Sequence, residues 1–265
     1  MHAFEYHRPA SSKDAVALIK GKTEARFLAG GQSLVQAMKL RLSSPTDLID
    51  LGTIKELSAI KVSGNAVEIG AMTRHADVAG SSAVQKAIPA LAALAGMIGD
   101  RQVRHMGTCG GSIANSDPAA DYPAAVLGLG ATITTSKRKI EADKFFTGLY
   151  ETALEPGELI TSVSFPVPKR AAYMKFKNPA SRFAIVGVFV ADFGGKVRVG
   201  VTGAGASAFR QADLEKALSA KFTVEAAAAI KVKPDGLNND LHASPEYRAH
   251  LITVMAKRAV EAALK

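Results

Sequence analysis

The chain has 265 residues, of which 48% are hydrophobic and 22% charged, so it can bury one large core or two modest ones. Its single cysteine, Cys109, excludes an internal disulfide framework and an iron–sulfur cluster held by this chain alone. The net charge of +9 comes from dispersed basic residues with few aromatic residues near the basic clusters and no tryptophan, a pattern that argues against a nucleic-acid partner.

The first 55 residues alternate between helical and extended patterns. The sequence Ser11-Ser12-Lys13-Asp14 predicts the start of a helix that continues to Ile19. Residues 26–29 predict a strand, the apolar spacing over 34–42 predicts a second helix, and residues 48–51 predict a second strand. The N-terminus lacks a basic-then-apolar signal pattern, so we expect a cytoplasmic protein.

The pattern changes between residues 56 and 167. Segments 57–62 and 66–69 predict a hairpin around the turn at Ser63-Gly64-Asn65. Helices are expected over 73–79 and 83–97, and Pro118 is expected in the first turn of another helix. A second hairpin around Lys137-Arg138-Lys139 and a strand over 159–163 follow. No segment reaches the length of a membrane span.

Pro166 and Pro168 mark the expected domain boundary. Beyond it, strands are predicted over 171–177, 184–192 and 197–201, the last two joined by a turn at residues 193–196. Helices are expected over 213–218, over 224–231 and from Pro245 to about Leu264. We therefore expect an α+β protein with subdomains at about 1–55 and 56–167, followed by a C-terminal domain (168–265) of a three-stranded antiparallel sheet plus helices.

Two glycine pairs stand out, in Ala29-Gly30-Gly31-Gln32-Ser33 and Thr108-Cys109-Gly110-Gly111-Ser112. Each is expected to join a short apolar run to a helix. Glycine lets the backbone approach a ligand closely, and the N–H groups at a helix N-terminus favour an anion. Two such segments indicate one large ligand, such as a diphosphate-bridged dinucleotide, although glycines at turns are often only turns.

Five motifs in this order resemble one family. They are residues 27–34, residues 70–75 (Gly-Ala-Met-Thr-Arg-His), residues 101–112, residues 117–121 (Asp-Pro-Ala-Ala-Asp) and residues 244–248 (Ser-Pro-Glu-Tyr-Arg). Over essentially its whole length, the chain resembles the medium, FAD-binding subunit of the molybdenum hydroxylases. This group includes carbon monoxide dehydrogenase of aerobic bacteria and xanthine dehydrogenase.

The resemblance implies a two-subdomain α/β FAD-binding domain of the vanillyl-alcohol-oxidase type, over which a C-terminal α+β domain closes. It also implies that both glycine segments hold the pyrophosphate through backbone N–H groups and hydroxyls. The residues implied in this contact are Ala29, Gly30, Gly31, Gln32, Ser33, Leu34, Thr108, Cys109, Gly110, Gly111 and Ser112.

Four further residues are implied around the cofactor, each with a structural alternative. Asp121 would contact cofactor hydroxyls, or simply favour the first turn of a helix. Lys177 would lie near the flavin, or face solvent. Phe183 would stack on the ring where relatives carry a tyrosine, or be a core aromatic. Ile160 or its neighbour Leu159 would form an apolar wall beside the flavin, or both would be core strand residues, which is the interpretation we favour.

As a member of this family, the chain would pass electrons from 2Fe–2S clusters on a small subunit, through FAD, to a final acceptor. The molybdopterin cofactor would lie on a large subunit, and the complex would be a dimer of heterotrimers. This chain itself would hold no metal, and no residue is expected to be catalytic. The alternatives are a stand-alone FAD-dependent oxidoreductase with its own substrate pocket and a non-enzymatic binding module.

Overall fold

The computed structural model describes residues 1–265 and begins with a three-stranded parallel sheet. Its strands are β1 (Glu5–His7), β3 (Asp47–Asp50) and β2 (Arg26–Leu28), in that spatial order, with β3 in the centre. Helix α1 (Ser12–Ile19) is capped by Ser11, whose hydroxyl accepts from the N–H of Asp14, as the sequence predicted. Helix α2 (Leu34–Lys39) follows the first glycine segment. We call residues 1–54 the N-terminal lobe.

A five-stranded antiparallel sheet forms the base of the central part of the molecule. Its order is β4 (Ile60–Ser63), β5 (Ala66–Gly70), β10 (Ile160–Pro166), β6 (Thr132–Thr135) and β7 (Lys139–Glu141). The predicted hairpins at residues 63–65 and 137–139 both form. The 3-10 helix η1 (Lys55–Ser58) precedes this sheet, and η2 (Ala142–Lys144) leads to a small hairpin of β8 (Phe146–Gly148) and β9 (Glu151–Thr152).

Six short helices lie between β5 and β6 in the chain. They are α3 (His75–Gly80), α4 (Ser82–Ala87), α5 (Pro89–Gly96), α6 (Arg101–Met106), α7 (Cys109–Asn115) and α8 (Tyr122–Leu129). Of these helices, α4, α7 and α8 contact this sheet. All eight residues of α8 are buried, because the C-terminal sheet covers the side that would otherwise face solvent. Helix α8 therefore lies in the interior of the molecule.

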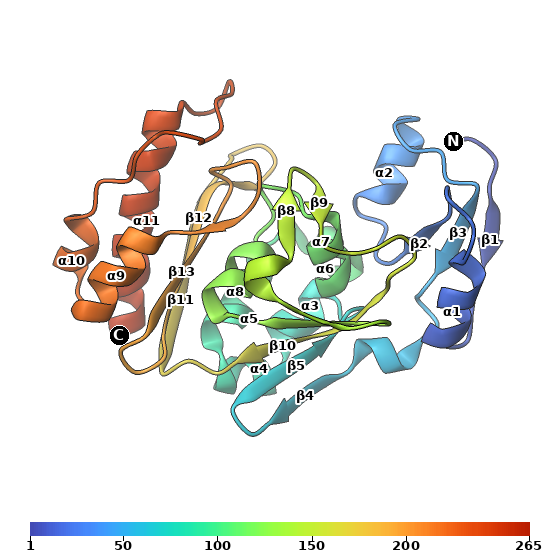
Figure 1. The fold of residues 1–265 in the computed structure, drawn as a ribbon, viewed down its shortest axis with the longest axis horizontal. Helices are drawn as coiled ribbons and strands as arrows, with labels where there is room; N and C mark the ends of the chain where they lie inside the picture. Colours follow the sequence, from blue (N-terminus) through green and yellow to red (C-terminus); the bar gives the residue numbers. More distant parts are fainter.

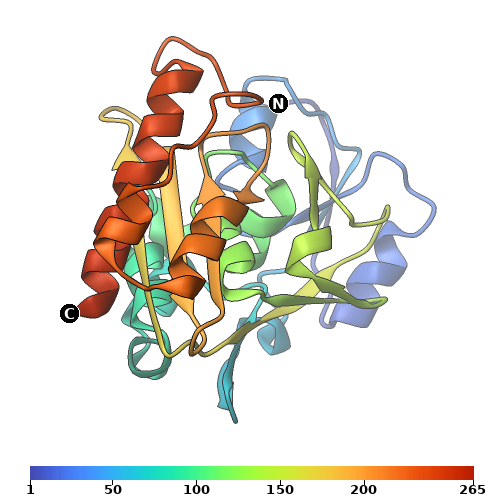
Figure 2. The ribbon, with the colours of Figure 1, turned by 60° about the vertical axis from the view of Figure 1, so that its left-hand side comes forward.

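The C-terminal sheet is antiparallel and has the order β11 (Arg170–Lys177), β12 (Ala184–Asp192), β13 (Val197–Thr202) and β14 (Phe209–Arg210). Helices α9 (Ala212–Ala220), α10 (Val224–Ala228) and α11 (Pro245–Leu264) cover its outer face, as Figures 1 and 2 show. Helices α5 and α8 pack on the opposite face. Strand β12 is buried along its entire length because both faces are covered.

Three hydrophobic clusters correspond to these three parts. The largest has 31 buried residues and lies around α5, α8 and the central sheet, the second has 19 and lies under α11, and the third has only eight, most of them in the N-terminal lobe. The termini lie at opposite ends of the longest axis (Figure 1).

The α+β class is confirmed, but three expectations about elements are wrong. The expected helix over 83–97 is two helices, because Pro89 disfavours the helical conformation at Ile88, whose φ is −139° and ψ 76°. Pro118 lies in a turn, and Pro123 occupies the first turn of α8 instead. The C-terminal sheet has a fourth strand, β14, whose two residues are too short to give a pattern.

Candidate functional site

The two glycine segments, far apart in sequence, touch each other. A Cβ atom built on Gly30 would lie 2.2 Å from the carbonyl oxygen of Met106 and 2.7 Å from the Cα atom of Gly107. A Cβ atom on Gly111 would lie 3.4 Å from the Cβ of Ala29. The N-terminal lobe and the central part therefore meet at these residues, as a single ligand held by both segments requires.

The first segment has a row of unused hydrogen-bond donors. None of the six backbone N–H groups from Ala29 to Leu34 donates to a protein acceptor. Gly31 has a φ of +70°, a left-handed conformation that turns the chain between β2 and α2. Successive N–H groups of this kind, next to the start of a helix, form a concave anion site.

The second segment is built differently. It is the first turn of α7, and Thr108 caps this helix by accepting from the N–H of Gly111 at 3.1 Å. The N–H of Cys109 donates to the carbonyl of Thr73, and that of Gly110 to the carbonyl of Ala71. The N–H groups of residues 109–112 therefore all donate within the protein, and the contact of this segment with a phosphate stays a prediction. The N–H of Thr108 and the hydroxyl of Ser112 remain without a protein partner.

The glycines of this segment also serve packing. A Cβ on Gly110 would lie 2.5 Å from the Cβ of Ala71, inside the central core. Cys109 is fully buried, and this burial raises the pKa of its thiol to about 12. Cys109 is therefore a small core residue and not a nucleophile.

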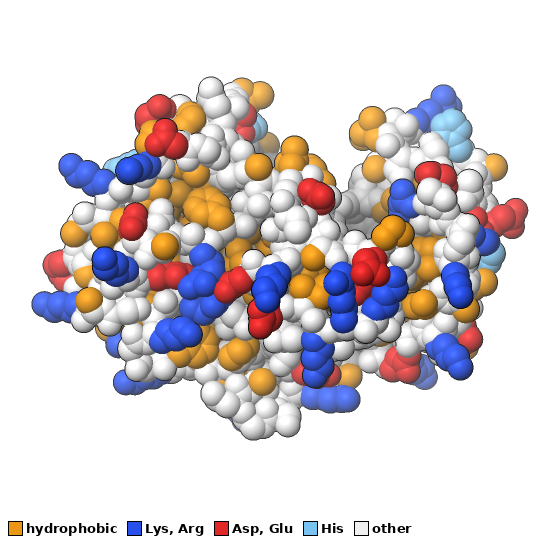
Figure 3. All heavy atoms as spheres, in the orientation of Figure 1, with side chains coloured by type: hydrophobic (Ala, Val, Ile, Leu, Met, Phe, Trp, Pro, Cys, Tyr) orange, Lys and Arg blue, Asp and Glu red, His pale blue; other side chains and the backbone are white.

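A deep notch separates the N-terminal lobe from the rest of the molecule in the space-filling view (Figure 3). Comparison with Figure 1 places α2 on one side of this notch, and α7 and the β8–β9 hairpin on the other. Charges of both signs are scattered over this face, and no single-sign patch dominates it.

Asp121 lies in a buried network of protein groups. Its carboxylate accepts from the hydroxyl of Tyr173 at 2.5 Å and pairs with the ammonium group of Lys175 at 2.9 Å. Burial raises the pKa of Asp121, and the charge of Lys175 opposes this shift. Both oxygens are engaged by protein groups, so the structure assigns Asp121 a structural role, and its contact with cofactor hydroxyls stays a prediction.

Sequence reasoning missed Lys175 and Tyr173. The alternation of a strand could have identified them, because Tyr173 and Lys175 lie on the same face of the predicted strand as Lys177. Lys177, at the end of this row, is exposed and has no ion-pair partner. Its place near a flavin stays a prediction.

The remaining two predicted residues differ in exposure. Phe183 lies in the turn between β11 and β12 and is 47% exposed, so it is not a core aromatic. Ile160 is 4% exposed and belongs to the largest hydrophobic cluster, so its side chain is covered by protein. The structure does not bring Ile160 to the surface beside the glycine segments.

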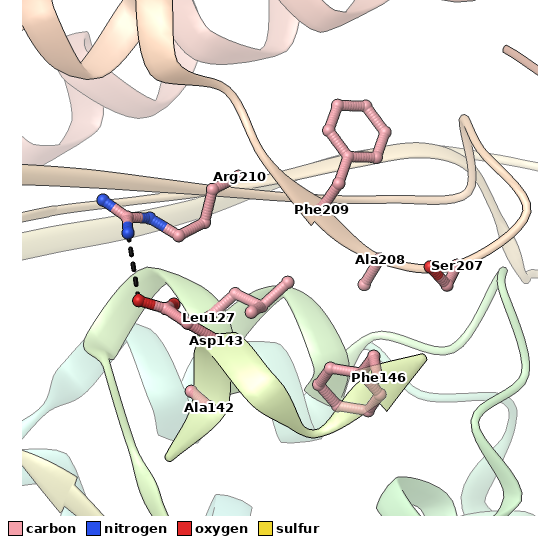
Figure 4. Close-up of a pocket in the computed structure, with 8 residues that line it drawn as sticks. All are labelled: Leu127, Ala142, Asp143, Phe146, Ser207, Ala208, Phe209 and Arg210. Carbon is pink, nitrogen blue, oxygen red and sulfur yellow. Dashed lines mark hydrogen bonds and ion pairs between the residues drawn. The ribbon is translucent and has the colours of Figure 1, made fainter. Parts of the chain in front are cut away.

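Two hollows of the protein lie near the glycine segments and beside β14. An open hollow of about 490 Å³ follows the exposed side of α6 at Arg101, Gln102, His105 and Met106. A second, of about 350 Å³, lies where β14 faces α8 and η2, and the pair of Arg210 with Asp143 spans it (Figure 4). Phe146 lies on the central side of this cavity. No group of His, Cys, Asp and Glu residues could hold a metal ion, and no helix is long and apolar enough to cross a bilayer.

Comparisons with known proteins find relatives that match nearly the whole length of the chain. Residues 2–168 match the family model described as the FAD binding domain in molybdopterin dehydrogenase. The chain is 37% identical to the carbon monoxide dehydrogenase medium chain of Afipia carboxidovorans, over 98% of this chain and 96% of the relative. It is 34% identical to the nicotine 6-hydroxylase medium subunit of Paenarthrobacter nicotinovorans, over 97% and 96% of the two chains.

Solved structures give the same result. A chain of the reconstituted CO dehydrogenase from Oligotropha carboxidovorans superposes with a TM-score of 0.88 at 36% identity. The superposition covers 99% of this chain and 98% of the other.

Proposed function

The chain belongs to the family of FAD-binding domains of molybdopterin dehydrogenases, and from this premise we propose that it is the FAD-carrying electron-transfer subunit of a heteromeric molybdenum hydroxylase. Its class is oxidoreductase, like that of its relatives. The observation that carries the proposal is the row of free N–H groups from Ala29 to Leu34, which touches the start of the second segment.

These residues fit the pyrophosphate of FAD. A diphosphate needs several hydrogen-bond donors within a short stretch of backbone, and residues 29–34 supply six. In this arrangement the first segment holds the phosphates mainly by backbone, while Thr108 and Ser112 add an N–H and a hydroxyl from the facing segment. Gly110 and Cys109 support α7 from the interior.

The flavin ring of bound FAD supplies the capacity to accept and release one or two electrons. We place Lys177 and Phe183 beside this ring, because both are exposed at the end of β11 and in the turn that follows it. A lysine there stabilises negative charge on the ring, and a phenylalanine offers an apolar face for stacking. We leave Ile160 outside the proposed site because it is covered by the core.

The partners follow from the relatives, which are named as medium chains and medium subunits. We propose that a large subunit carries the molybdopterin cofactor, that a small subunit carries 2Fe–2S clusters, and that two such heterotrimers form a dimer. The single buried cysteine of this chain agrees with clusters on a neighbour. We keep the proposed domain boundary at residues 167 and 168, and the cytoplasmic location stays a prediction.

Hydrogen–deuterium exchange tests whether the first segment, and not the second, binds the phosphates through its backbone N–H groups. Amides 29–34 have no protein acceptor and should exchange quickly in the FAD-free chain, then slow markedly when FAD binds. Amides 109–112 already have protein acceptors and should change little. The proposal fails if residues 29–34 exchange at the same rate with and without FAD.

Purification of the native complex tests the partners and the alternative function. A molybdenum-containing chain and a cysteine-rich small chain should accompany this one. Substrate turnover by the isolated FAD-loaded chain would favour a stand-alone oxidoreductase instead.

A further inference from the structure

Only four buried side-chain polar atoms in the protein have no hydrogen-bond partner, and three of them belong to segment 71–75 and to the tyrosine ring that packs against it. These three are Thr73 Oγ1, His75 Nδ1 and Tyr122 Oη, on side chains that are 1%, 4% and 0% exposed. The fourth, Nε of Arg248, belongs to a guanidinium group that makes other hydrogen bonds at the far end of the molecule. Because buried polar groups are normally paired, such a cluster calls for a ligand.

The cluster lies directly behind the first turn of α7. Segment 71–75 is joined to this turn by three backbone hydrogen bonds, from Cys109 to Thr73, from Gly110 to Ala71 and from His75 to Gly107. The rings of His75 and Tyr122 are 5.4 Å apart between centroids. Tyr122 also lies beside the Cys109 thiol, but their contact falls short of hydrogen-bond geometry.

The chemistry of the cluster is neutral. Burial, assisted by the charge of Arg104, lowers the pKa of His75 to about 4, so one ring nitrogen donates and the other accepts at neutral pH. Burial also raises the pKa of Tyr122 well above its usual value, with smaller contributions from Cys109 and Asp121. A metal ion would need charged or clustered ligands, which this region lacks. Water is the smallest molecule that both donates and accepts hydrogen bonds.

We propose that one or more buried water molecules bind between Thr73, His75 and Tyr122 and fix segment 71–75 against the first turn of α7. This site is independent of the proposed function, because it satisfies protein groups whether or not FAD is bound. It also explains why a histidine, a tyrosine and a threonine occupy positions inside an otherwise apolar core.

Removal of single hydroxyl groups tests the site, because the direction of the change in melting temperature differs between a hydroxyl that binds water and one that has no partner. If Tyr122 Oη binds water, Tyr122→Phe deletes a hydrogen bond and should lower the melting temperature by about 2–4 °C. If the hydroxyl has no partner, its removal relieves a desolvation cost and should raise the melting temperature or leave it unchanged. We expect the first result, also for Thr73→Val, with less than additive loss in the double variant. The second result overturns the proposal.

Thr202→Val is the matched control, because the Thr202 hydroxyl donates to the carbonyls of Pro118 and Ala120 and its loss should lower the melting temperature in either case. A high-resolution crystal structure of the unmodified protein gives a second measurement that does not depend on variants folding. Density for a water within about 3.2 Å of Tyr122 Oη or His75 Nδ1 supports the proposal. A dry cluster, or side chains rearranged to bond one another, overturns it.

Discussion

Gly31 is the residue of the first segment whose backbone conformation itself requires glycine. Its φ of +70° lies in the left-handed region, where an L side chain costs roughly 1–2 kcal/mol. A Cβ there would also lie 2.9 Å from Cγ2 of Val35 in α2. The direction of the free N–H groups therefore depends on this residue.

Gly31→Ala should weaken FAD binding about tenfold, equivalent to about 1.4 kcal/mol, because the segment must rearrange to relieve strain. Titration of the apo-protein with FAD measures the change. Gly64→Ala is the control, since Gly64 has a φ of +56° with open space around it in the β4–β5 turn. Equal affinity of the two variants for FAD would contradict the role of Gly31.

Lys177 is a residue whose charge is available to a ligand, because it is exposed and forms no ion pair. Lys177→Met should leave the melting temperature and FAD content unchanged but lower the flavin reduction potential by about 20 mV, the equivalent of a contribution of about 1 kcal/mol for a two-electron couple. Potentiometric titration measures the shift, and Lys61→Met on β4 is the control. An unchanged reduction potential would mean that Lys177 only faces solvent and does not act on the flavin.

At the scale of elements, Asp121 joins three of them. It precedes α8, pairs with Lys175 and Tyr173 on β11, and Lys175 also donates to the carbonyl of Met97 at the end of α5. The Lys175 side chain is only 2% exposed. A buried ion pair of this kind contributes through the damage caused when one partner is lost.

Asp121→Asn should therefore destabilise the protein by about 3–5 kcal/mol in urea unfolding, because it leaves a buried ammonium group unpaired. Lys175→Met added to it should recover much of the loss. FAD binding by the double variant then separates two roles of Asp121. Retained affinity means that its role is structural, and lost affinity despite a recovered fold means that it contacts the cofactor.

Sequence reasoning succeeded where a local pattern sufficed. The capped start of α1 at Ser11, the turn at Gly64 and the amphipathic helix α11 all carry such patterns, and all were confirmed. The glycine motifs were also recognised in the sequence, but the sequence did not show which contact requires a glycine at each position. Gly30 and Gly110 approach other backbone, at Met106 and Ala71, and only the folded chain shows which neighbour lies opposite a missing Cβ.

The remaining errors have the same origin. Two-residue β14 exists because β13 offers it a partner, and Asp121 is held by the Tyr173 hydroxyl and the Lys175 ammonium group, 52 and 54 positions away along the chain. Neither interaction leaves a periodic signal near the residue concerned. Helix α4 ends before Pro89 for a local reason that the sequence did contain, and the expected single helix overlooked it.

At the scale of the whole molecule, the three parts differ in the size of their cores. The cluster of the N-terminal lobe has eight buried residues, against 31 and 19 in the others. Local stability follows the amount of buried apolar surface, so this lobe should open first. The proposed ligand would bridge it to the larger central core.

Limited proteolysis should therefore cut residues 1–54 before the rest of the FAD-free chain, and FAD should protect this region. A ligand at a hundredfold excess over its Kd adds about 2.7 kcal/mol to the state that binds it. Cleavage sites read by mass spectrometry check the order. Initial cutting in β11–β13, or equal cutting with and without FAD, would contradict this assignment.

The contact of Gly30 with Met106 and Gly107 has a kinetic consequence. Because the backbone at Gly30 packs directly on that of Met106 and Gly107, we predict that the two walls of the site stay in contact during coenzyme capture and that binding requires no hinge motion. Association should accordingly be a one-step process whose observed rate climbs linearly with coenzyme concentration and never reaches a plateau.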